Sequence, residues 1–116
     1  MAVERARRAS RNRRQHHRAR LEKGVQYYRN QRLHTASVAN ISEGGLCLQG
    51  STGSLMVGDV LKLFVTLPPQ GVRRRDRLCL LQGQVVWTRN NRAGVRFIDP
   101  PLENTLELRT YVKLAA

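Results

Sequence analysis

The sequence is poor in acidic residues. Eight aspartates and glutamates face 21 lysines and arginines, which leaves a formal net charge of +13 and an isoelectric point near 11.5. Such an excess indicates an anionic partner, such as a nucleic acid, a nucleotide, an anionic membrane or an acidic protein surface. Lysine is scarce too, because arginine outnumbers it eighteen to three. Guanidinium groups bind phosphates and guanine edges with paired hydrogen bonds, so the ratio favours phosphate or guanine recognition, although a GC-rich genome gives the same ratio.

Long apolar runs and paired cysteines are also missing. No run approaches the ~20 residues that a transmembrane helix needs, and the arginine-rich start lacks the apolar core of a signal peptide. We therefore expect a cytoplasmic protein without a transmembrane segment. Cys47 and Cys79 lie singly within apolar runs and not in a Cys-x-x-Cys pair, which argues against a zinc site. We expect two buried free thiols, with a single disulfide as the alternative.

Residues that would support catalysis are equally sparse. The histidines His16, His17 and His34 have no nucleophile or carboxylate partner at a recognisable spacing. No glycine-rich phosphate loop opens a helix, and no Walker-type lysine is present. These absences favour a binding protein over an enzyme, with no metal and no bound cofactor.

The 116 residues suffice for one domain, and their charge divides them into two parts. Residues 1–20 hold eight arginines against one acid and almost no apolar side chain. A segment without an apolar face cannot pack, so we expect residues 1–19 to form a flexible arm and residues 20–116 to fold. A second group of arginines, at residues 73–77, is predicted to lie in an exposed hairpin loop.

The folded part has the pattern of an all-β protein. Alternating or β-branched segments predict six strands, at residues 21–29, His34–Ile41, Leu46–Gln49, Val60–Leu67, Leu78–Thr88 and Gly94–Ile98. Asn30-Gln31 and Asn90-Asn91 are predicted to be turns between strands. Six strands in succession followed by one helix favour a six-stranded antiparallel β-barrel with a C-terminal α-helix.

The terminal helix is predicted to start near Asp99, as its N-cap, with Pro100 at the first helical position. Its apolar side chains would dock on the sheet; they are Leu102, Leu106, Leu108, Tyr111, Val112 and Leu114. Trp87, near the end of its strand, is predicted to lie in the core, with stacking at the rim of a site as the alternative.

The stretch from Asn40 to Gly45 connects two of the predicted strands. In the strand before it, Thr35, Ser37 and Ala39 alternate with Ala36 and Val38, and Asn40 is in phase with the second set. Asn40 and Ser42 have short side chains that bond nearby backbone or a polar ligand, and Gly45 allows close backbone approach. Alone, this composition is typical of an ordinary turn.

Together with the arm, the turn carries a family pattern. Arg14-Gln15-His16-His17-Arg18 has the form R-x-x-x-R, and Asn40-Ile41-Ser42-Glu43-Gly44-Gly45, some twenty residues later, has the form (D/N)-x-S-x-x-G. This pair resembles the PilZ domain, the bacterial receptor module for cyclic di-GMP (c-di-GMP). Three later segments also look like PilZ strands, at residues 58–63, 83–87 and 94–97, so the resemblance extends from about Arg13 to Val112.

The resemblance implies a fold and a ligand site. PilZ domains are six-stranded antiparallel barrels with a terminal helix, which agrees with the pattern above. Their arm wraps the dinucleotide, and the positions of Arg14 and Arg18 contact phosphates and guanine. The second motif, here Asn40, Ser42 and Gly45, contacts a guanine edge and lets the ligand approach. Since Asn40 replaces the commoner aspartate, it offers guanine one acceptor oxygen in place of two.

The resemblance also bears on stoichiometry and signalling. A basic residue before the first motif arginine, here Arg13, is associated in the family with binding c-di-GMP as an intercalated dimer, so we expect that form. We expect a second-messenger receptor whose arm becomes ordered on binding and that signals to a downstream protein partner, which the sequence does not identify. The alternative is a small basic barrel that binds nucleic acid non-specifically. The six aromatic residues lie mostly at apolar-face positions, which makes nucleic acid the less favoured ligand.

Overall fold

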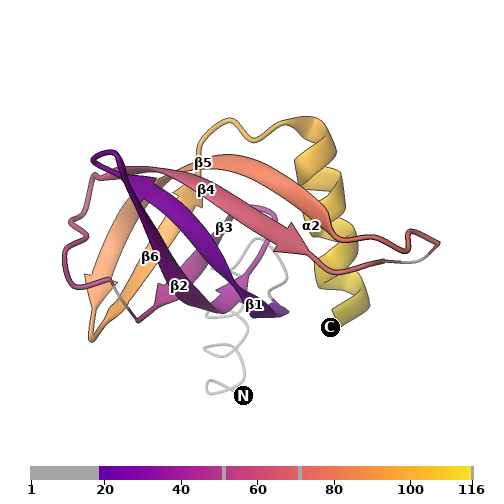
Figure 1. Ribbon diagram of the computed structural model, residues 1–116, viewed down its shortest axis with the longest axis horizontal. Coiled ribbons are helices and arrows are strands. Elements are labelled where there is room, and N and C mark those ends of the chain that lie inside the picture. Colours follow the sequence, from indigo (N-terminus) through magenta and orange to yellow (C-terminus); the bar gives the residue numbers. More distant parts are fainter. Residues whose placement is uncertain (1–18, 51, 71, 116) are drawn as a thin grey trace, which may run out of the picture.

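The structure, a computed structural model, describes residues 19–50, 52–70 and 72–115. These residues form six strands and one helix: β1 (Ala19–Arg29), β2 (Arg32–Ile41), β3 (Gly45–Gln49), β4 (Val60–Leu67), β5 (Arg77–Arg89), β6 (Arg92–Phe97) and α2 (Leu102–Ala115). The strands close into an antiparallel barrel in the order β1-β2-β3-β6-β5-β4, and α2 lies beside one end of it (Figure 1). The predicted six-stranded barrel with a C-terminal helix is confirmed.

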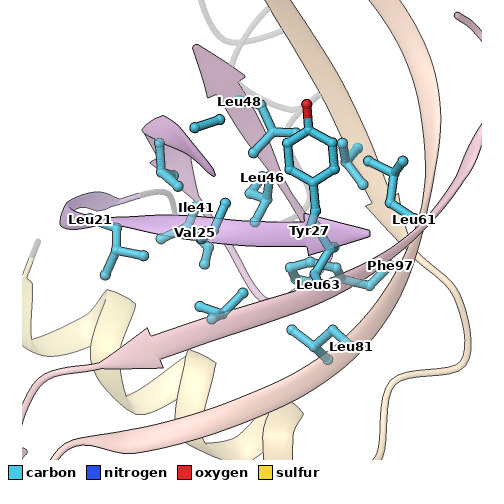
Figure 2. Close-up of a cluster of buried hydrophobic side chains, with 14 of the residues drawn as sticks. Leu21, Val25, Tyr27, Ile41, Leu46, Leu48, Leu61, Leu63, Leu81 and Phe97 are labelled. Atoms are coloured by element: carbon cyan, nitrogen blue, oxygen red, sulfur yellow. The ribbon is translucent and has the colours of Figure 1, made fainter. Parts of the chain in front are cut away.

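The barrel encloses one hydrophobic core, which every strand supplies with alternate side chains. Figure 2 shows Tyr27 of β1 among leucines of β3 and β4. Four side chains of β4 point inward and are fully buried: Leu61, Leu63, Val65 and Leu67. Val60, the first residue of the strand, is half exposed. A closed barrel has one inner face, so period-two alternation decides which side chains remain outside and available to a ligand.

Two hairpins have tight turns at the predicted positions, and both turns are of one type. Asn30 and Gln31 have φ angles of 52° and 65°, and Asn90 and Asn91 have 47° and 63°. Positive φ at both central residues is the signature of a type I′ turn, whose twist matches that of the flanking strands. The β1–β2 and β5–β6 hairpins therefore have equivalent backbone geometry.

The terminal helix starts later than its predicted cap. The carbonyl of Pro101 accepts the first helical hydrogen bond, from Thr105 N at 3.0 Å, so α2 begins at Leu102. Asp99 has a left-handed φ of 41° and lies outside the helix, so the prediction of Asp99 as the cap was wrong. The predicted broad apolar face is also narrower: Leu108 and Val112 are buried and Tyr111 packs on the core. The other three leucines of α2 are exposed; they are Leu102, Leu106 and Leu114.

The arginine loop before β5 is held against α2 and is only partly free. Arg73 donates to Glu107 at 3.2 Å, and Arg77 donates to Glu103 at 3.5 Å. Arg74 and Arg75 are exposed, as expected for a loop. Half of this charge therefore anchors the loop to the helix.

Both cysteines are free and buried, as expected. Burial raises the pKa of the Cys79 thiol, and the nearby Arg77 only partly offsets this. Cys79 is therefore a neutral core side chain at physiological pH. Among the described residues, no helix is long and apolar enough to cross a membrane.

Candidate functional site

The turn between β2 and β3 is closed by Ser42. Its amide donates to Gly45 O at 2.8 Å, its hydroxyl donates to the same carbonyl at 3.3 Å, and that hydroxyl accepts from Gly44 N at 3.2 Å. Ser42 is 3% exposed. The side chain of the predicted site residue Ser42 thus stabilises the conformation of the turn.

Gly45 is required by the neighbouring strand. It pairs with Arg96 of β6, and a Cβ placed on it would lie 2.1 Å from Val95 O. Phe97 N also donates to Gly44 O at 2.9 Å. Close backbone approach is therefore real at Gly45, but the approaching group is β6.

Asn40 lies on the outer face of the barrel, although strict alternation along its strand predicts that its side chain points inward. Val38 and Ile41 both point into the core, because a register shift between Val38 and Asn40 makes Ala39 an extra residue. Such a bulge re-aims the side chains that follow it. Of the three motif residues of the turn, Asn40 is the one whose side chain faces outward.

The arm joins the barrel next to this turn. The structure does not describe Arg13, Arg14 or Arg18, but β1 begins at Ala19, which pairs with Ile41 of β2. Arg18 is thus covalently joined to a residue opposite the motif turn.

Helix α2 contacts both parts of this region. The Tyr111 hydroxyl donates to the carbonyl of Arg20, at the base of the arm, at 2.6 Å. Arg109 Nε donates to Glu43 Oε2, within the motif turn, at 2.7 Å. The helix therefore links the start of β1 and the β2–β3 turn.

Two open grooves run along the outer wall of the barrel, and neither is lined by a residue of the motif turn. One, of about 960 Å³, is polar and extends from Arg20 past Ala39 and Gln49 to Arg92. The other, of about 670 Å³, continues from Arg92 to Trp87. These volumes are in the range of small-molecule sites. The grooves share Arg92, so they join the base of the arm to the β5–β6 hairpin.

Several arginines around these grooves have no acidic partner among the described residues. Arg29, Arg73, Arg77 and Arg109 each bind a carboxylate. For three arginines that line the grooves, Arg20, Arg89 and Arg92, the described part of the chain shows no such ion pair. Uncompensated guanidinium groups beside a polar groove favour an anionic ligand.

Trp87 is on the outer wall, so its predicted place in the core was wrong. Its side chain is 43% exposed. A Cβ built on Gly94 would lie 2.0 Å from Trp87 Nε1, which shows that the indole covers Gly94. A register shift between Val85 and Trp87 moves this side chain from the inner face to the outer face. The exposed indole of Trp87 is compatible with the alternative prediction, which was stacking at the rim of a site.

These features define a small basic β-barrel with open, arginine-lined grooves on its outer wall. Residues 12–114 match the PilZ domain family, and the chain belongs to that family. The match includes both sequence motifs and all six strands.

Three solved structures have a similar fold. The inhibitor of motility MotI/DgrA of Bacillus subtilis superposes with a TM-score of 0.75 at 19% identity, covering 87% of this chain and 50% of that one. PlzA of Borreliella burgdorferi, solved in complex with c-di-GMP, gives 0.63 at 16%, covering 90% and 43%. The PilZ domain of CeSA from a cellulose-synthesizing bacterium gives 0.57 at 14%, covering 85% and 94%. This chain thus spans half or less of MotI and PlzA, and comparison with curated proteins gives no match.

Proposed function

We propose that this protein is a receptor for c-di-GMP that closes its N-terminal arginine arm over the ligand and signals to a downstream protein. One observation carries the proposal: β1 starts opposite Ile41, so the arginine motif enters the barrel beside the turn that holds the second motif. In this proposal, the two motifs, some twenty residues apart in sequence, form one site.

The comparisons support this ligand. The chain belongs to the PilZ family, and PlzA, one of the structures with the same fold, was solved with c-di-GMP bound. The composition agrees, because the ligand carries two phosphates and two guanines, and arginine binds both. A receptor for such a second messenger acts in the cytoplasm and needs neither a metal nor catalysis.

Each motif residue has a role in this proposal. Arg14 and Arg18 bind phosphate and guanine from the arm, and Arg13 favours an intercalated dimer of the ligand. Asn40 contacts a guanine edge through its amide. Ser42 and Gly45 hold the turn that presents Asn40, so their contribution to binding is mainly indirect.

Helix α2 is the route by which binding would reach a partner. Its Tyr111 bonds the base of the arm, and its Arg109 bonds the motif turn at Glu43. When the ligand orders the arm, the position of Arg20 changes, and the hydrogen bond from Tyr111 transmits this displacement to α2. The helix then presents an altered surface to the partner. Because an arm that folds on binding loses conformational entropy, affinity will depend on its length and charge.

Isothermal titration calorimetry with c-di-GMP tests the proposal. We expect saturable binding at micromolar ligand with two ligand molecules per chain, and a loss of at least a hundredfold in affinity for the double variant Arg14→Ala plus Arg18→Ala, since each charge-assisted contact contributes about 1.5–3 kcal/mol. The control is Arg7→Ala plus Arg11→Ala, which removes the same charge at the same spacing outside the motif. Equal losses for both pairs, or no heat for the unaltered protein, would exclude this function.

A salt titration separates the receptor from a non-specific nucleic-acid binder. Neutralising many phosphates makes affinity fall steeply with salt, so a generic oligonucleotide would be released between 50 and 200 mM salt. We expect c-di-GMP to bind more tightly than linear diguanylate at either salt concentration. Preference for the oligonucleotide would support the nucleic-acid alternative.

A further inference from the structure

The outer face of β4 carries apolar side chains on both sides of one charge. Period-two alternation points Val60, Lys62 and Phe64 outward, while the residues between them fill the core. The Phe64 ring meets the Tyr28 ring of β1 edge-on, with centroids 5.5 Å apart, and on the other side Phe64 pairs with Leu80 of β5. Tyr28, Val60 and Leu80 are 39%, 49% and 56% exposed. Exposed apolar side chains that gather among polar ones mark an interaction surface.

These side chains surround an open hollow of about 620 Å³, which we call the β4 hollow. Tyr28, Val60 and Phe64 give it an apolar lining, and polar residues that include Lys62 and Gln82 complete it. The β4 hollow shares no lining residue with the two grooves described above. An apolar hollow with a polar edge accepts a bulky side chain of a partner, which is the usual anchor of a protein interface.

Lys62 brings an uncompensated positive charge into the hollow. Tyr28 of β1 and Gln82 of β5 pair with it, and Val60 and Phe64 flank it along β4, so none of these four neighbours carries a negative charge. Every ion pair among the described residues is made by an arginine, and the described part of the chain therefore supplies no carboxylate to Lys62. An ammonium group beside apolar surface favours a partner that presents a carboxylate next to an apolar side chain.

The charge and the shape of this surface favour a protein partner. A second copy of the chain would bring a net charge of +13 against +13, and a twofold axis at the hollow would place Lys62 near its own copy. An anionic bilayer takes up apolar side chains that protrude from a surface, whereas here they line a hollow. An acidic segment of another protein matches both the charge and the shape.

We propose that the β4 hollow docks an acidic segment of a partner protein, which inserts a large apolar side chain between Tyr28 and Phe64 and places a carboxylate beside Lys62. The role of this contact in signalling rests on the proposed function, whereas the contact itself needs no c-di-GMP. Asn104 of α2 donates to Leu80 O at 3.0 Å, and Leu80 pairs with Phe64. The helix is thus bonded to a strand beside the β4 hollow, so a displacement of α2 reaches the docking surface.

Fluorescein-labelled peptides provide defined probes of this contact. The first contains one phenylalanine between aspartates, the second has alanine in place of the phenylalanine, and the third has lysines in place of the aspartates. Fluorescence polarisation at physiological salt is recorded on the full chain without c-di-GMP. We expect the first peptide to bind at least about tenfold more tightly than either of the others, because it alone fills the hollow and meets Lys62. Amide NMR shifts locate the contact, and we expect them at Tyr28, Lys62 and Phe64.

Charge reversal at Lys62 tests the electrostatic part of the contact. We expect Lys62→Glu to bind the aspartate peptide about tenfold more weakly and the lysine peptide more tightly than the unaltered protein does. The matched control is Lys113→Glu, which makes the same charge change at an exposed lysine in the last turn of α2, outside the hollow. We expect the control to change either affinity by less than about twofold. Equal losses in the two variants would show a general charge effect and overturn the assignment of Lys62.

The pair Val60→Ser and Val86→Ser tests the apolar part. Both valines are about half exposed, at 49% and 44%, but only Val60 lines the hollow. We expect Val60→Ser to weaken binding of the aspartate peptide about fivefold, because less apolar surface is buried, and Val86→Ser to leave it unchanged. Urea denaturation checks that both variants fold. Equal affinities of the two variants would overturn the assignment of the hollow.

Three further outcomes would overturn the docking site. They are a dimer in sedimentation velocity that Val60→Ser dissociates, binding to vesicles of phosphatidylcholine and phosphatidylglycerol that Val60→Ser abolishes, and the absence of saturable peptide binding. Calorimetry with c-di-GMP on the same variants separates this inference from the proposed function. We expect Lys62→Glu to bind c-di-GMP within about twofold of the unaltered protein, since Lys62 lies outside both arginine-lined grooves. Peptide binding without heat from c-di-GMP would overturn the receptor and leave the docking site.

Discussion

The β1–β2 and β5–β6 hairpins have the same local design but different surroundings. Each has a type I′ turn without glycine, and each is flanked by a directly paired couple of arginines, Arg29 with Arg32 and Arg89 with Arg92. In the first hairpin, Arg29 Nε donates to Asp59 Oδ2 at 2.8 Å. In the second, the structure shows no described carboxylate bound to either arginine. The repulsion is relieved in one hairpin and left in place in the other.

The difference comes from a third segment of the chain. Asp59 lies in the turn before β4, where its carboxylate also accepts from Met56 N at 2.8 Å. This turn is bonded to β5 through Val85 N and Asp59 O at 2.9 Å. A carboxylate built into the barrel thus serves the first hairpin. The second hairpin keeps its charge beside an open groove.

Reversal of one charge in the second hairpin gives the largest expected effect. Arg92→Glu places a carboxylate opposite Arg89, and an opposite-charge pair across strands contributes about 0.2–1 kcal/mol. We expect the free energy of unfolding to rise by this amount while c-di-GMP affinity falls by a hundredfold or more, because a carboxylate repels the phosphate. Urea denaturation and calorimetry measure the two quantities.

The same reversal in the first hairpin is the control. In Arg32→Glu, Arg29 keeps its bond to Asp59, so we expect stability to change by less than about 0.5 kcal/mol and affinity by less than twofold. A loss of affinity in Arg32→Glu as large as in Arg92→Glu would contradict the distinction between the two hairpins.

Removal of the compensating carboxylate has the next largest effect. Asp59→Ala breaks the bonds to Arg29 and to Met56 N, and we expect it to lower the free energy of unfolding by about 1–2 kcal/mol. Ligand affinity should remain unchanged, because Asp59 borders neither groove. Thermal denaturation and calorimetry check both outcomes. If Asp59→Ala is as stable as the unaltered protein, the first hairpin is not compensated in the way that its geometry indicates.

The strands and turns could be predicted from the sequence because their signals are local. The limits of Val60–Leu67 agree with β4, and both hairpin turns are where Asn-containing pairs interrupt alternation. The family and the motif turn also followed from short patterns. Helix α2 was placed less well, since Asp99 has the composition of a cap but a φ of 41° that takes it out of the helix.

The site was harder to predict, because bulges break the alternation on which the sequence argument depends. Trp87 is in phase with Val85, and Asn40 is in phase with Val38, so strict alternation places all four inside. Bulges depend on pairing with other strands and leave no clear mark in one segment. The compensation of Arg29 by Asp59, thirty residues away, is equally invisible locally. The role of the arm at Arg13, Arg14 and Arg18 stays a prediction.

The smallest expected effect is a difference in stability between glycine variants of the two hairpin turns. Gln31 and Asn91 occupy the same turn position with φ angles of 65° and 63°. Asparagine tolerates this left-handed conformation better than glutamine, because its short amide bonds the local backbone. Glycine relieves the strain at either site. We therefore expect Gln31→Gly to raise the free energy of unfolding by about 0.5–1 kcal/mol and Asn91→Gly by a few tenths.

Urea denaturation of the two glycine variants measures this difference, and calorimetry extends it to the ligand. Asn91 lines the groove beside Arg92, so a more flexible turn there would cost affinity, whereas Gln31 lies in the other hairpin. We expect Asn91→Gly to weaken c-di-GMP binding about two- to threefold and Gln31→Gly to leave it unchanged. Equal stabilisation with equal affinities would mean that the two turns are interchangeable, and that the difference between the hairpins resides only in their arginines.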